Sequence, residues 1–189
     1  MAVYTAGDLR KGVKIVIDGQ PNLMVDMEFV KPGKGQALYK CRLKNMITGT
    51  QVDRTYRSGD TFQSADVEER TMEYLYNDGT FYNFMDQKTF EQFHLTDAQI
   101  GENKNFLTDN LQVDVMLFQD RPIGVTLPNF VVLQVVRADP FAKGDTATGV
   151  TKPVTVQTGY ELQVPAFVAE GEKIQIDTRT GQYVTRVKG

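Results

Sequence analysis

The stretch QALYKCRLK, residues 36–44, alternates two kinds of side chain along its length. One set is apolar or small: Ala37, Tyr39, Cys41 and Leu43. The set between them is cationic: Lys40, Arg42 and Lys44. A repeat of two residues is the period of a β-strand whose two faces meet different surroundings. The stretch therefore predicts a strand with one buried face and one basic, exposed face.

The same period recurs in VKIVID (13–18) and LQVDVMLF (111–118), and short turn signals separate such runs. Four of these signals end in glycine and predict hairpins: Asp18-Gly19, Thr48-Gly49, Asp78-Gly79 and Thr180-Gly181. Only LTDAQIGENKNFL (95–107) suits a helix, with Thr96 or Asp97 as N-cap and Gly101 as an early stop. We predict an all-β protein made of small barrels.

Charge is distributed unevenly along the 189 residues, although the net charge is only -3. Residues 1–64 carry ten Lys/Arg and six Asp/Glu, residues 65–128 carry four and twelve, and residues 129–189 carry seven and six. The signs change near SGDTFQSADVEER (58–70) and near VTLPNF (125–130), where Pro128 interrupts a strand. We predict three modules with those bounds, and a polyanionic partner for the first module.

Catalytic and metal-binding chemistry has little support in this composition. The chain has one cysteine and one histidine, and Cys41 alternates in phase with core residues. A Cys41–His94 dyad is conceivable, but nothing supplies a third group to orient it. No cluster of ligands has metal-site spacing, and no apolar run approaches the ~20 residues that span a bilayer. We expect a non-enzymatic protein of the reducing cytoplasm, a monomer without metal or cofactor.

The segment KPGKG, residues 31–35, stands between two strand-like runs and predicts a hairpin tip. Pro32 fixes its own φ, while Gly33 and Gly35 permit positive φ and leave both sides of Lys34 uncovered. A lysine held at an apex adds little to stability. The segment is therefore a plain turn, or its lysine enters a polyanionic cleft or serves as an attachment point. Lys31, Lys40 and Arg42 would add phosphate contacts nearby.

Beyond these patterns, the whole chain resembles bacterial elongation factor P. The resemblance rests on EFVKPGKGQA (28–37), ITGTQV (47–52), YLYNDGTFYNFMD (74–86), KGDTATG (143–149) and the long run from Thr158 to Val187. It implies a KOW-type, SH3-like barrel followed by two OB-folds, in an L-shaped arrangement similar to tRNA. It also implies a factor that binds the ribosome between the P and E sites and relieves stalling at consecutive prolines.

The resemblance further implies roles for individual residues. Lys34 matches the lysine that points along the P-site peptidyl-tRNA toward the peptidyl transferase centre. In a branch with a similar tip, a paralogue of lysyl-tRNA synthetase adds a β-lysyl group, and hydroxylation can follow; an aminopentanol group stays open. Positions matching the loop near the E-site codon of the mRNA are Gly144, Asp145 and Thr146, and positions matching tRNA-facing residues are Tyr183 and Arg186.

Two other classes remain open from the residues alone. A general single-stranded RNA-binding protein needs exposed aromatic platforms beside basic grooves. Here the aromatics cluster in YLYNDGTFYNF (74–84), inside the acidic module. A lysine-tethered cofactor carrier would usually flank its lysine with apolar residues such as methionine, and the tip has none.

Overall fold

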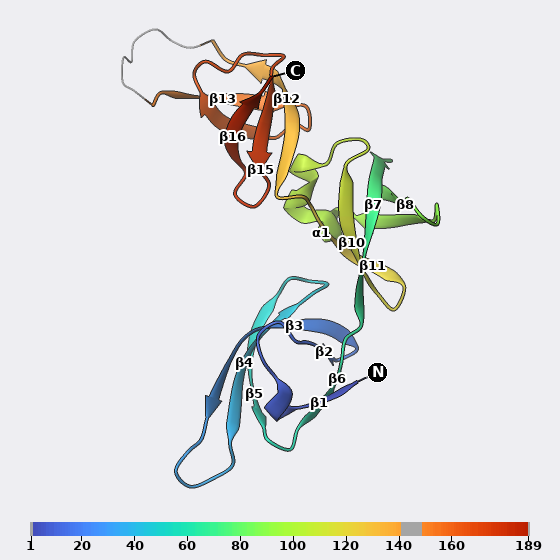
Figure 1. Ribbon diagram of the computed structural model, residues 1–189, viewed down its shortest axis with the longest axis vertical. Coiled ribbons are helices and arrows are strands. Elements are labelled where there is room, and N and C mark those ends of the chain that lie inside the picture. The colour runs from blue at the N-terminus through green and yellow to red at the C-terminus, as the bar shows by residue number, and fades with distance from the viewer. Residues whose placement is uncertain (1, 141–148, 189) are drawn as a thin grey trace. The chain divides into compact units, whose positions relative to one another are not determined.

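The computed structural model describes residues 2–140 and 149–188 (Figure 1). The described chain is almost entirely β-structure, which confirms the predicted class. The first elements are β1 (Val3–Thr5), the 3-10 helix η1 (Ala6–Asp8), β2 (Lys14–Ile17), β3 (Gln20–Val30), β4 (Leu38–Asn45), β5 (Gln51–Arg57) and β6 (Thr61–Gln63). They form a four-stranded sheet, β2-β3-β4-β5, and a two-stranded sheet, β1-β6.

Two five-stranded sheets follow along the chain. The first contains β7 (Val67–Asn77), β8 (Phe81–Asp86), β9 (Gln92–Thr96), β10 (Gln112–Phe118) and β11 (Arg121–Thr126). The second contains β12 (Phe130–Ala138), β13 (Thr151–Val156), β14 (Glu161–Pro165), β15 (Lys173–Asp177) and β16 (Gln182–Val187). Both use one strand order, third-second-first-fourth-fifth. This shared topology is that expected of two related five-stranded barrels.

Contacts along the chain define two compact units. The first comprises Met1–Arg70 and Val115–Gly124, and the second comprises Thr71–Asp114 and Val125–Gly189. Three-module bounds at 64 and 128 stay a prediction. The first unit has a core of buried residues inside its N-terminal barrel: Ala6, Leu9, Ile15, Met24, Cys41 and Leu43. Cys41 and Leu43 therefore face inward from β4, as their alternation predicted.

The predicted turns and helix are confirmed by the described chain. Asp18-Gly19 joins β2 to β3 with both residues at positive φ, 51° and 75°, as a tight hairpin turn requires. The helix α1 spans Asp97–Ile100, with Thr96 as N-cap and Gly101 as C-cap, and the 3-10 helix η2 (Gly101–Phe106) continues from it. The short helix η1 was not predicted, because three residues carry no detectable periodicity.

Candidate functional site

The candidate site begins with the hairpin of β3 and β4, the long blue hairpin that ends in a loop in Figure 1. The strands stay paired from Asn22–Asn45 up to Val30–Leu38, with one bulge between Met24 and Asp26. Ring contact between Phe29 and Tyr39, with centroids 5.2 Å apart, stiffens the hairpin just below its loop. The loop of residues 31–37 is therefore anchored at both ends by paired strands.

Lys34 is exposed at the middle of this loop. No ion pair within the described residues involves it. Gly35 has φ 139°, a conformation that favours glycine, and a side chain there would meet Pro32 at 3.7 Å. Gly33 does not take a positive φ, so the expected backbone freedom is used at Gly35 alone. Gly33 instead leaves open space beside the lysine.

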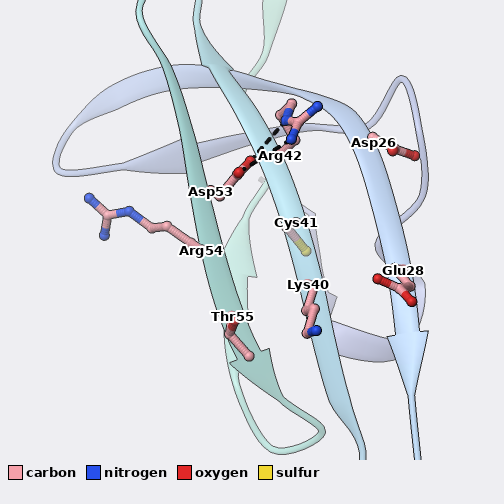
Figure 2. Close-up of a pocket in the computed structure, with 8 residues that line it drawn as sticks. All are labelled: Asp26, Glu28, Lys40, Cys41, Arg42, Asp53, Arg54 and Thr55. Atoms are coloured by element: carbon pink, nitrogen blue, oxygen red, sulfur yellow. Dashed lines mark hydrogen bonds and ion pairs between the residues drawn. The ribbon is translucent and has the colours of Figure 1, made fainter.

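The cations of β4 point outward, but their surroundings differ from a plain basic stripe. Figure 2 shows the outer face of β3, β4 and β5, where a cavity of about 260 Å³ is lined by three cations and three carboxylates among its residues: Asp26, Glu28, Lys40, Cys41, Arg42, Asp53, Arg54 and Thr55. In register, Glu28 faces Lys40, while Asp26 and Asp53 face Arg42 from either side. This face is therefore balanced in charge.

Arg42 is held in this row by a two-point contact. Its Nε donates to Asp53 Oδ1 at 2.9 Å, and its Nη2 donates to Oδ2 at 3.3 Å (Figure 2). The hydrogen bond from Arg42 lowers the pKa of Asp53, and the same contact raises the pKa of Arg42. Lys40 has no ion pair in the described chain. Lys40 is thus freer than Arg42 to meet a phosphate.

The remaining predicted residues lie elsewhere. Tyr183, half-buried, and Arg186, exposed, lie on β16 in the second unit. Gly144, Asp145 and Thr146 lie outside the described residues. The tip residues, Lys40 and Arg42 share one hairpin of the first unit.

The residues of the considered dyad have separate structural roles. Cys41 is buried, and burial raises the pKa of its thiol. His94 lies on β9, where its Nδ1 shares a hydrogen bond with Asn83 Oδ1 of the neighbouring strand β8. Among the described residues, no group of three His, Cys, Asp or Glu is placed to hold a metal ion. Helices long and apolar enough to cross a membrane are likewise not found in the described chain.

Sequence reasoning missed the acidic partners of the stripe and two exposed aromatic rings in the C-terminal barrel. Asp26 and Glu28 alternate with Met27, so their outward position could have been read from the period of β3. The pairing of Arg42 with Asp53 depends on the register of β5. The rings are Phe130 and Phe167, each beneath an arginine.

The aromatic residues of the acidic module differ from these two exposed rings. Three of them are buried in the core: Tyr74, Tyr82 and Phe84.

Comparison with known proteins identifies the class and then the family. Family models match residues 5–62 (elongation factor P KOW-like domain), 67–125 (elongation factor P OB domain) and 131–186 (elongation factor P, C-terminal). Elongation factor P of Syntrophus aciditrophicus (strain SB) is 57% identical over 187 residues, 99% of this chain and 100% of that relative. Elongation factor P of Desulfosudis oleivorans is 59% identical over 186 residues, 98% and 100% of the two chains.

A solved structure supports the fold. Eukaryotic translation initiation factor 5A from Methanococcus jannaschii aligns with a TM-score of 0.57 at 22% identity, over 67% of this chain and 92% of that chain. Together the matches define a translation elongation factor that combines a KOW-like domain with OB-folds. The chain belongs to the elongation factor P family.

Proposed function

We propose that this chain acts on the ribosome, between the P and E sites, and speeds peptide bond formation at consecutive prolines. The observation that carries the proposal is Lys34, exposed and without an ion pair in the described chain, on a loop whose base is fixed by paired strands. Such a group can enter a narrow polyanionic cleft that a protein domain cannot. The partners are the ribosome, the P-site peptidyl-tRNA and the E-site codon of the mRNA, in the cytoplasm.

The mechanism needs positioning rather than acid–base chemistry. Proline is conformationally restricted as peptide donor and as acceptor, so its reacting atoms seldom reach a productive geometry. Holding the acceptor end of the tRNA in place lowers the entropic part of the barrier, and each ~1.4 kcal/mol gives a tenfold rate increase. Lys31, Lys34 and Lys40 supply cations along the hairpin for this contact.

We also propose that Lys34 is β-lysylated by a paralogue of lysyl-tRNA synthetase. Its ε-amine would attack the activated carboxyl carbon of β-lysine, forming an amide as the activating group leaves and the amine loses a proton. The amide removes one positive charge, but the added group brings two ammonium groups. The arm therefore becomes longer and stays cationic, and hydroxylation would add a hydrogen-bonding group.

The test compares modified and unmodified protein in single-turnover synthesis of a Pro-Pro bond and of an ordinary peptide bond at saturating factor. We expect the modified protein to accelerate the Pro-Pro bond selectively. Equal rates with both forms would transfer the role to the unmodified hairpin, and equal acceleration of both bonds would contradict the proline-specific function. The intact mass of native protein separates a lysyl addition from a biotinyl or lipoyl group.

A further inference from the structure

The inward face of the β3–β4 hairpin remains apolar beyond the end of the buried core. Along β3, Met24 is fully buried and Met27 packs against the core, whereas Phe29 is 52% exposed. Tyr39 lies directly opposite Phe29, on the same face of β4 as the buried Cys41, and is half-buried. Phe29 is therefore an aromatic side chain that the core itself does not need.

Phe29 is the outermost member of a row of aromatic side chains that crosses the N-terminal barrel. Tyr39 of β4 lies opposite Phe29 on one side and opposite Tyr56 of β5 on the other. The Tyr56 ring meets that of Phe62, on β6, edge-on with centroids 4.6 Å apart, and Phe62 lies opposite Tyr4 of β1. The four inner members are half-buried and pack against the core. The row thus connects the base of the loop to the N-terminal strand.

The end of β3 that carries Phe29 is supported from one side only. The partner strand β2 pairs with Gln20 to Leu23, and backbone hydrogen bonds from Gly12 and to Val13 extend this contact to Met24. Beyond Met24, β3 has no strand partner on that edge within the described chain. The last residues of β3 therefore depend on β4 alone, as in an isolated two-stranded ribbon, which is marginally stable and twists easily.

Cross-strand side-chain contacts are what can stiffen such a ribbon. On the outward face, Glu28 lies opposite Lys40, but no ion pair joins them in the described chain. On the inward face, the ring centroids of Phe29 and Tyr39 are 5.2 Å apart, a distance typical of an attractive aromatic pair. This contact lies one residue below the last backbone pair before the loop, so it acts where the loop direction is set.

We propose that Phe29 is a positioning residue for Lys34. Its ring, packed against Tyr39, fixes the direction in which the loop of residues 31–37 leaves the barrel. The inference rests on the proposed function, because this direction matters only if Lys34 must reach one place on its target. A loop on a loose base spends less time in that place, so the rate at saturation falls while binding through the rest of the protein is retained.

The first measurement is made on the full-length protein without ribosomes. Nitrogen-15 relaxation gives order parameters for the backbone amides of Lys34 and Gly35. We expect lower values in Phe29→Ala than in the wild type, and wild-type values in Phe29→Tyr, which keeps the ring. The matched control is Phe81→Ala, which removes a ring that is 39% exposed on a hairpin of the second unit and should leave both amides unchanged.

The second measurement is single-turnover synthesis of a Pro-Pro bond over a range of factor concentrations. Intact mass establishes that Lys34 is in the same state in every variant, and melting curves establish that each is folded at the assay temperature. Phe29→Ala should lower the rate at saturating factor about tenfold and leave the half-saturating concentration within about twofold. Phe29→Tyr should restore the rate, and Phe81→Ala should match the wild type.

Unchanged order parameters in Phe29→Ala would overturn the inference, and so would an unchanged rate at saturation. A raised half-saturating concentration with an unchanged saturating rate would assign Phe29 to direct contact with the target instead. A wild type that fails to accelerate the Pro-Pro bond would contradict the proposed function. The order parameters would then still show whether Phe29 orders the loop, since their measurement involves no ribosome.

Discussion

Arg42 and Asp53 face each other across β4 and β5, and two hydrogen bonds of 2.9 and 3.3 Å join the guanidinium to the carboxylate. This pairing divides the cations of the hairpin into two kinds. Arg42 shares its charge with a neighbour, whereas Lys40 has no ion pair in the part of the chain that the structure describes. A nucleic-acid partner should distinguish between them.

The first prediction tests whether Lys40 contacts phosphate and Arg42 does not. Lys40→Gln should weaken ribosome binding and reduce its salt dependence by about one unit of slope, as the loss of one phosphate contact does. The double variant Arg42→Gln/Asp53→Asn keeps the local net charge and should leave the slope unchanged. The measurement is the dissociation constant over a series of salt concentrations. A slope reduced equally in both variants would show that Arg42 contacts phosphate despite its partner.

The second prediction concerns Lys34. Lys34→Ala should leave the melting temperature within about a degree of wild type, since an exposed side chain with no ion pair among the described residues contributes little to stability. It should abolish the acceleration of Pro-Pro synthesis. Lys34→Arg keeps the charge but has no ε-amine to acylate, and it should fail almost as fully. Rescue by arginine would instead assign the effect to charge alone.

The third prediction compares two glycines of the C-terminal barrel. Gly181 has φ 72°, and a side chain added there would collide with the hydroxyl of Tyr160. The ring of Tyr160 packs edge-on against Phe106. Gly159 has φ 87° and open space around it. Gly159→Ala should cost about 1–2 kcal/mol, the penalty of a left-handed conformation. Gly181→Ala should cost more, because Tyr160 must also move, and denaturant unfolding of the two variants measures the difference.

Equal free energies of unfolding for these two variants would show that the Tyr160 side chain can move aside without cost. We expect a cost, because two contacts hold the Tyr160 side chain in place. Its hydroxyl donates to the carbonyl oxygen of Gly181 at 3.2 Å, and its ring centroid lies 5.1 Å from that of Phe106.

The fourth prediction is a pH dependence. The Asp78 carboxylate accepts hydrogen bonds from the backbone N–H groups of Phe81 and Thr80, each at 2.8 Å, and these bonds lower its pKa. Because the pKa of Asp78 is lower in the folded state, its carboxylate stabilises the fold at pH values above the pKa of the unfolded state, about 3.9. This contribution is lost as the pH falls through the pKa of the folded state. Asp78→Asn should therefore show a smaller drop in melting temperature than wild type between about pH 5 and pH 3.

An Asp78→Asn variant that loses stability in acid as steeply as wild type would contradict this assignment.

Much of the local structure follows from the sequence alone. The two-residue period placed Cys41 and Leu43 in the core and the cations outside, and Asp-Gly turns marked hairpins. Thr96 and Gly101 bounded the short helix. These features depend on residues close together in the chain, so a short stretch of sequence is enough to predict them. The tip KPGKG is local in the same sense, and with the other matching segments it indicated the family.

Tertiary structure alone decided which side chains meet. Arg42 and Asp53 are eleven residues apart, and Arg186 and Glu172 are fourteen apart, so each contact depends on which strands or loops pack together and in what register. A shift of one residue in pairing would move every side chain to the opposite face of its strand. Sequence period therefore determined that β4 has a charged face, whereas strand register determined that this face is balanced. The packing of the loop between β14 and β15 against β16 determined that Phe167 lies beneath Arg186.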